Sequence, residues 1–103
     1  MDDQRLVRIA EIEVDPDQLD AYKALLAKVG AISVADEPGV LMLHSASLRD
    51  VPHHIRVFEV YESLAAYDAH IQTAHFLAYR AATAGMVIAL RLIDVDPILL
   101  AAK

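Results

Sequence analysis

Along the chain, segments with the apolar spacing of a strand alternate with segments that have the apolar spacing of a helix. The order of these segments constrains the fold more than any other feature. From Leu6 to Val14, apolar and polar residues alternate with the period of two that is typical of a strand. Asp15 to Gln18 then supply a helix cap, a proline at the first helical position and a glutamine that completes a capping box. A helix is predicted to follow, because apolar residues recur at helical spacing at Leu19, Tyr22, Leu26 and Val29.

The remaining segments extend this order to β-α-β-β-α-β. Asp36 to Gly39 ends the first helix, since the residue before a proline avoids helical geometry, and Ser63 is a suitable cap for a second helix. Further strands are predicted at Val40–Leu48, Ile55–Glu62 and Met86–Val95. The order predicts a single α+β domain over residues 1–103 with the ferredoxin-like arrangement, in which both helices cover one face of a four-stranded antiparallel sheet.

The second helix is predicted to break near its middle. Its apolar stripe, which includes Leu64 and Tyr67, loses phase after Gln72, and a break at Gln72 and Thr73 restores the pattern. Thr73 would then cap a new helical segment that carries His75 in its first turn.

Composition excludes several classes of function. The chain has no cysteine, so disulfides, thiolate nucleophiles, iron–sulfur clusters and sulfur-ligated zinc are excluded. A net charge of -6 and scattered basic residues argue against a nucleic-acid partner. No apolar run is long enough for a membrane span and the first residues do not resemble a signal peptide, so a cytoplasmic protein without a membrane partner is expected.

The predicted sheet is apolar on both faces of its first and last strands. In the first strand Ala10 and Ile12 lie on one face and Val7 and Ile9 on the other. Two helices cover one face only, and the other would expose more apolar area than monomers usually show. A second copy of the same sheet would cover it, which predicts a homodimer. The alternative is that mild hydrophobicity is tolerated on an exposed face.

Three motifs together resemble the antibiotic biosynthesis monooxygenase family. They are Glu37 to Leu41 at the start of the second strand, Phe58 to Tyr61 at the end of the third, and the pattern Tyr67-x-x-His70-x-x-Thr73-x-His75-Phe76-x-x-Tyr79. The resemblance covers nearly the whole chain. It implies a dimeric α+β barrel made by packing two sheets, and oxygenation of electron-rich quinols or polyphenols by dioxygen without metal, flavin or other cofactor.

The family is mixed in function, and this sequence departs from two of its branches. The haem-degrading and polyketide-oxidising branches rely on an asparagine and a tryptophan, and the chain contains neither residue. The histidine pattern instead resembles the quinol monooxygenase and signal-degrading branches. A cofactor-independent monooxygenase acting on a small aromatic quinol is therefore the leading prediction. The alternatives are an isomerase or other enzyme on a small signal metabolite, and a non-catalytic ligand-binding dimer module.

Cofactor-free oxygenation needs a base for a phenolic proton, and histidine suits this role. His75 is the leading candidate, because the positive end of a helix dipole disfavours the imidazolium and keeps the ring able to accept a proton. The alternative is a histidine that only satisfies a hydrogen bond there. His70 is the second catalytic candidate, with a solvent-facing or interfacial position as its alternative. On a continuous helix the two rings would lie about 140° apart, too far for a shared metal, so no metal centre is expected.

Glu59 is the third catalytic candidate, because its carboxylate lies among apolar neighbours in a strand. Such a group either pairs with a cation, for which Arg8 and Arg91 are candidates, or has its pKa raised. The alternative is a buried ion pair that fixes the strand register.

Other side chains are candidates for binding the substrate. Stacking on a planar ring is predicted for Tyr61, Tyr67, Phe76 and Tyr79, although aromatic residues at helical spacing are more often core. His44 is a further pocket candidate, with a core or interface position as the alternative. His53 and His54 are expected at the surface, pointing to opposite sides of the chain.

Overall fold

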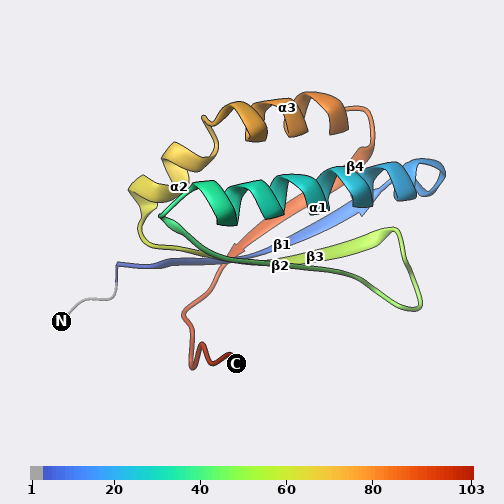
Figure 1. Ribbon diagram of the computed structural model, residues 1–103. Helices are drawn as coiled ribbons and strands as arrows, with labels where there is room; N and C mark the ends of the chain where they lie inside the picture. Colours follow the sequence, from blue (N-terminus) through green and yellow to red (C-terminus); the bar gives the residue numbers. More distant parts are fainter. Residues whose placement is uncertain (1–3) are drawn as a thin grey trace.

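The structure is a computed structural model that describes residues 4–103. In chain order the elements are β1 (Leu6–Val14), the short 3₁₀ helix η1 (Pro16–Gln18), α1 (Leu19–Asp36), β2 (Val40–Ser47), β3 (His54–Tyr61), α2 (Leu64–His70), α3 (Ala74–Thr83) and β4 (Val87–Asp94). The strands form one four-stranded sheet in the order β2-β3-β1-β4, in which every neighbouring pair is antiparallel. The helices all lie on one side of this sheet (Figure 1). The predicted ferredoxin-like fold is confirmed.

Local sequence signals account for the helix boundaries. The Asp15 side chain accepts hydrogen bonds from the Asp17 backbone N–H at 3.0 Å and from Gln18 Nε2 at 3.1 Å. The first turn is a 3₁₀ turn and α1 begins at Leu19, which differs from the predicted start. The predicted break in the second helix is confirmed, because α2 ends at His70 and Thr73 caps α3 by accepting from the Phe76 N–H at 3.2 Å.

The core lies between the helices and the inner face of the sheet. Its buried members are Ala10, Ile12, Val14, Tyr22, Ile55 and Val57. They come from β1, α1 and β3, which are the central strands of the sheet and the helix that crosses them. Alternation along β3 puts Glu59 and Tyr61 on the same inner face as Val57, so the strand carries polar groups toward the helices as well.

Among residues 4–103, no helix lies on the outer face of the sheet (Figure 1). The side chains on this face are apolar only in part. Strand register and alternation place Ile9, Phe58 and Ile93 on this face beside each other. Toward the other end of β1, Glu11 forms ion pairs with Arg56 at 3.4 Å and with Arg91 at 3.6 Å. Arg91 therefore lies on the face opposite Glu59 and is not its partner. The expectation of an apolar outer face holds for one half of the face only.

The chain beyond β4 runs on the same side of the sheet as this outer face (Figure 1). It is joined to β1 by a hydrogen bond from the Val95 N–H to the Val7 carbonyl at 3.0 Å. Val7 is 2% exposed although none of the helices of the described chain covers it. None of the helices among residues 4–103 is both long and apolar enough to cross a bilayer.

Candidate active site

A cavity of about 520 Å³ lies between the helices and the inner face of the sheet. Its size is typical of small-molecule sites. The predicted aromatic residues all line it, and they are Tyr61, Tyr67, Phe76 and Tyr79. Leu90 and Leu92 of the edge strand β4 also line it and are 59% and 45% exposed, so the cavity opens along this edge. The site is therefore an apolar, aromatic hollow with a side entrance.

Glu59 and Tyr61 form a polar pair on the cavity wall. The Tyr61 hydroxyl donates a hydrogen bond to Glu59 Oε1 at 2.5 Å. Burial raises the pKa of the Glu59 carboxyl, and the hydrogen bond from Tyr61 and the charges of His70 and Arg8 offset only part of this effect. Burial and the neighbouring Glu59 also raise the pKa of Tyr61. Glu59 therefore lies where a carboxyl group holds its proton more readily than in water.

Arg8 approaches the site but does not form an ion pair with Glu59. Its Nε donates a hydrogen bond to Asp94 Oδ1 at 2.6 Å, and its guanidinium lies 4.4 Å from the centre of the Tyr67 ring. The salt bridge joins β1 to β4, while the stacking joins the sheet to α2. Arg8, one of the two predicted ion-pair partners of Glu59, thus affects the Glu59 carboxylate through its charge and not through a direct contact.

Glu37 contacts both candidate histidines, His70 of α2 and His75 of α3. Its Oε2 lies 3.0 Å from His70 Nδ1 and 2.6 Å from His75 Nε2. Burial favours the neutral form of Glu37, but the hydrogen bonds from His75 and His70 outweigh burial and lower the pKa of the carboxyl. An ionised carboxylate only accepts hydrogen bonds, so each facing ring nitrogen carries a proton. In a neutral His70 ring the proton then sits on Nδ1, and Nε2 is free to accept one.

The structure places His70 and His75 differently with respect to the cavity. His70 is 5% exposed and lines the cavity, with its ring centre 5.4 Å from that of Tyr61 and 5.0 Å from that of Phe76. His75 is not among the residues that line the cavity, and its side chain is 20% exposed. The break between α2 and α3 lets the two rings converge on Glu37, so the separation expected for a continuous helix does not occur.

Glu37 was missed by sequence reasoning as a site residue, although it opens the motif Glu37 to Leu41. It caps the end of α1, which brings the loop before β2 against α2. The loop approaches α2 so closely that a Cβ on Gly39 would lie 2.6 Å from the Ala66 Cβ. The Glu62 N–H also donates to the Gly39 carbonyl at 2.8 Å. This close packing holds the Glu37 carboxylate beside His70.

His44 lies elsewhere. A bulge in β2 between Val40 and Met42 shifts the alternation, and His44 pairs with Phe58 of the outer face. The imidazole is exposed, and His44 is not among the residues that line the cavity. The structure thus brings together seven of the eight predicted site residues and leaves His44 on the opposite face of the sheet.

Glu37, His70 and His75 are also side chains of the kind that bind transition metals, and their ligating atoms lie within 4.8 Å of one another. Two ligands on a tetrahedral zinc ion lie about 3.3 Å apart, because each bond is about 2.0 to 2.1 Å long. The 2.6 Å contact between His75 and Glu37 is shorter than this and is close to the length of a charge-assisted hydrogen bond. The cluster is therefore arranged as a hydrogen-bonded network.

Solved structures with this fold come from several bacteria. A "putative antibiotic biosynthesis monooxygenase" from Bacteroides thetaiotaomicron is 38% identical, with a TM-score of 0.93 and coverage of 97% of this chain and 95% of that chain. A "putative monooxygenase" from Lactobacillus acidophilus is 27% identical, with a TM-score of 0.86, and the match covers 92% of this chain and 51% of that chain. A Caulobacter crescentus structure at 22% identity and a TM-score of 0.86 shares the fold. No curated protein matches the chain significantly.

The fold and the cavity define a small α+β protein with an apolar hollow that opens along the β4 edge of the sheet. The sequence profile of the antibiotic biosynthesis monooxygenase family matches residues 5–82. The chain belongs to this family, and the resemblance found in its motifs is confirmed.

Proposed function

We propose that this protein is a cofactor-independent monooxygenase that oxidises a quinol or a related electron-rich phenol in the cavity. The observation that carries the proposal is the buried His70 imidazole on an aromatic-lined wall, held through Nδ1 by the ionised Glu37 carboxylate. A carboxylate that orients a histidine in this way fixes its tautomer and stabilises the imidazolium that forms. The membership of the family supports the same class of reaction.

The proposed reaction begins with proton transfer. His70 Nε2 takes the proton of a phenolic hydroxyl, and the resulting phenolate passes one electron to dioxygen. The superoxide and the semiquinone radical then combine, which forms a bond between a ring carbon and oxygen. Protonation of the outer oxygen gives a ring hydroperoxide. Loss of the hydrogen on that ring carbon as a proton, with cleavage of the O–O bond, releases hydroxide, which takes up a proton to become water.

The overall reaction consumes one quinol and one dioxygen and yields one hydroxyquinone and one water. The quinol supplies all four electrons, so no external reductant is required. Glu59 and Tyr61 provide a second group for proton transfer, since burial raises the pKa of the Glu59 carboxyl and the Tyr61 hydroxyl is hydrogen-bonded to it. His75 has a positioning role in this proposal, because it donates to the same Glu37 oxygen as His70.

The lining of the cavity favours an aromatic substrate over a phosphorylated metabolite. Arg80 is the one lysine or arginine among the residues of the described chain that line the cavity, and it lies 5.8 Å from the Phe76 ring centre. Glu59 adds a carboxyl group to the same cavity. A phosphate group would meet few cations and an acidic neighbour there, whereas an uncharged ring would meet aromatic side chains.

Oxygen consumption with a naphthohydroquinone tests the proposed function. We expect the protein to consume dioxygen well above the rate of autoxidation and to form the hydroxynaphthoquinone, which mass spectrometry identifies. Asp68→Asn is the control, because this exposed carboxylate of α2 does not line the cavity, and the variant should retain the rate. Quinol binding without oxygen uptake above autoxidation would instead identify a ligand-binding module and reject the enzyme.

The expectation of a cytoplasmic protein stays a prediction.

The proposal includes a homodimer formed through the outer face of the sheet. Apolar side chains on this face, including Phe58, lie beside the charged ladder of Glu11, Arg56 and Arg91. In sedimentation we expect a dimer, and Phe58→Glu should shift it to monomer because it places a charge in the contact. Val34→Glu, at an exposed position of α1, is the control that should remain dimeric. A stably folded wild-type monomer would contradict the assignment.

A further inference from the structure

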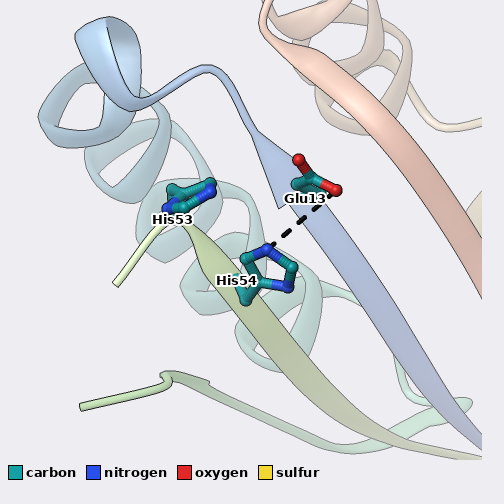
Figure 2. A group of neighbouring side chains, drawn as sticks. All are labelled: Glu13, His53 and His54. Atoms are coloured by element: carbon teal, nitrogen blue, oxygen red, sulfur yellow. Dashed lines mark ion pairs between the residues drawn. The ribbon is translucent and has the colours of Figure 1, made fainter. Parts of the chain in front are cut away.

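A second cluster of metal-ligating side chains lies on the outer face, away from the cavity. Glu13 near the end of β1, His54 at the start of β3 and His53 in the preceding turn lie side by side (Figure 2). The ligating atoms of all three lie within 4.8 Å of one another. None of the three lines the large cavity. The expectation that the two histidines point to opposite sides of the chain is wrong, because His53 belongs to the turn and not to the strand.

The backbone holds the three residues in place. Glu13 and His54 are direct cross-strand partners in the pairing of β1 with β3, so their side chains leave the same face. The Val14 N–H donates to the His53 carbonyl at 2.9 Å, which ties the turn to the end of β1. Within the turn, the His54 N–H donates to the Val51 carbonyl at 2.9 Å. The positions of the side chains are therefore set by hydrogen bonds that do not involve the side chains themselves.

The three side chains interact only weakly with one another. Among the described residues, Glu13 pairs with His54 (Figure 2). The distance from Glu13 Oε1 to His54 Nε2 is 4.0 Å, which is longer than a hydrogen bond. The rings of His53 and His54 meet edge to face with their centres 4.6 Å apart. All three residues are half-buried in the single chain, where solvent still reaches them. This differs from Glu37, His70 and His75, whose nitrogen and oxygen atoms are joined by short hydrogen bonds.

We propose that Glu13, His53 and His54 bind a divalent transition metal ion such as Zn²⁺. Imidazole nitrogens and a carboxylate oxygen are ligands that zinc prefers, and three protein ligands leave a position for water. Two ligands of one zinc ion lie roughly 3.3 Å apart. Small rotations of the three half-buried side chains would bring their ligating atoms from within 4.8 Å to this distance. The metal would join β1 to the turn between β2 and β3. It takes no part in the proposed oxygenation, because it lies on the opposite face of the sheet.

Calorimetric titration of metal-free, untagged protein with Zn²⁺ tests this proposal. We expect one Zn²⁺ per chain, together with a rise in melting temperature. His53→Ala, His54→Ala and Glu13→Gln should each weaken binding at least about tenfold, since even changes beside a metal ligand usually cost about 10- to 100-fold. His44→Ala is the matched control, because it removes an exposed histidine from the same face without touching the cluster.

The competing site is tested in parallel. Glu37→Gln removes the carboxylate that both other histidines contact, and we expect it to leave Zn²⁺ binding unchanged. The proposal is overturned when the three variants bind Zn²⁺ as tightly as the wild type, or when Glu37→Gln is the substitution that abolishes binding. Several weak ions per chain that no single variant removes would equally reject a defined site.

Discussion

Replacing His70 by glutamine should reduce quinol turnover by about a hundredfold or more. A positioned general base typically contributes about 10²- to 10⁴-fold to a rate, and glutamine has no group that takes up a proton near neutral pH. Its amide can still donate to Glu37, so the loop between α1 and β2 should keep its place. The measurement is kcat/KM from oxygen uptake, with the melting temperature as a check on folding. His70→Ala should recover part of its activity when free imidazole is added.

His75→Gln is the matched comparison and separates the two histidines. Because His75 is not among the cavity-lining residues and contacts Glu37 rather than the cavity, its loss should lower kcat/KM much less than the loss of His70. The reverse order, with His75→Gln inactive and His70→Gln active, would return the base to the residue that the sequence favoured. A His70→Ala variant that free imidazole does not reactivate would argue against proton transfer by the His70 ring.

The fold was predictable because its signals are local. The period-two strands, the cap at Asp15 and the break at Thr73 each depend on a few neighbouring residues, and the structure contains all of them. The order of these elements then leaves few alternatives to a ferredoxin-like sheet. The bulge in β2 was not predictable from alternation alone, and it is the reason why His44 lies on the outer face.

The sequence named most of the side chains that the structure brings together, but it missed Glu37, misplaced His44 and did not give the geometry. The motif that resembles the family named His70 together with the aromatic residues, and strand alternation placed Glu59 among apolar neighbours on the face of Tyr61. The structure brings these side chains to one cavity. The choice between the two histidines depended on Glu37, which is distant in sequence and reaches them through the packing of Gly39 against Ala66. Contacts of this kind arise from tertiary packing, which single-sequence periodicity does not encode.

Glu37→Gln should lower kcat/KM by about 10- to 100-fold without removing a group that touches the substrate. The carboxylate holds the His70 Nδ1–H and stabilises the imidazolium, and an amide carries no charge for the second task. Because the carboxylate acts on the base, the pH profile of kcat/KM should change together with the rate. Asp68→Asn, at an exposed carboxylate of α2, should alter neither. A Glu37→Gln variant with the wild-type rate and profile would show that Glu37 is structural only.

The same substitution should change how stability depends on pH. The pKa of Glu37 is lowered in the folded protein below its ordinary value of 4.5, so the unfolded chain binds the proton more tightly. Its contribution to stability is therefore present above about pH 4.5 and is lost as the pH falls through the lower folded-state pKa. Urea unfolding at about pH 7 and about pH 3.5 should show a smaller loss of unfolding free energy for Glu37→Gln than for the wild type or Asp68→Asn. Equal losses in all three proteins would mean that the hydrogen bonds from His70 and His75 do not stabilise the ionised carboxylate.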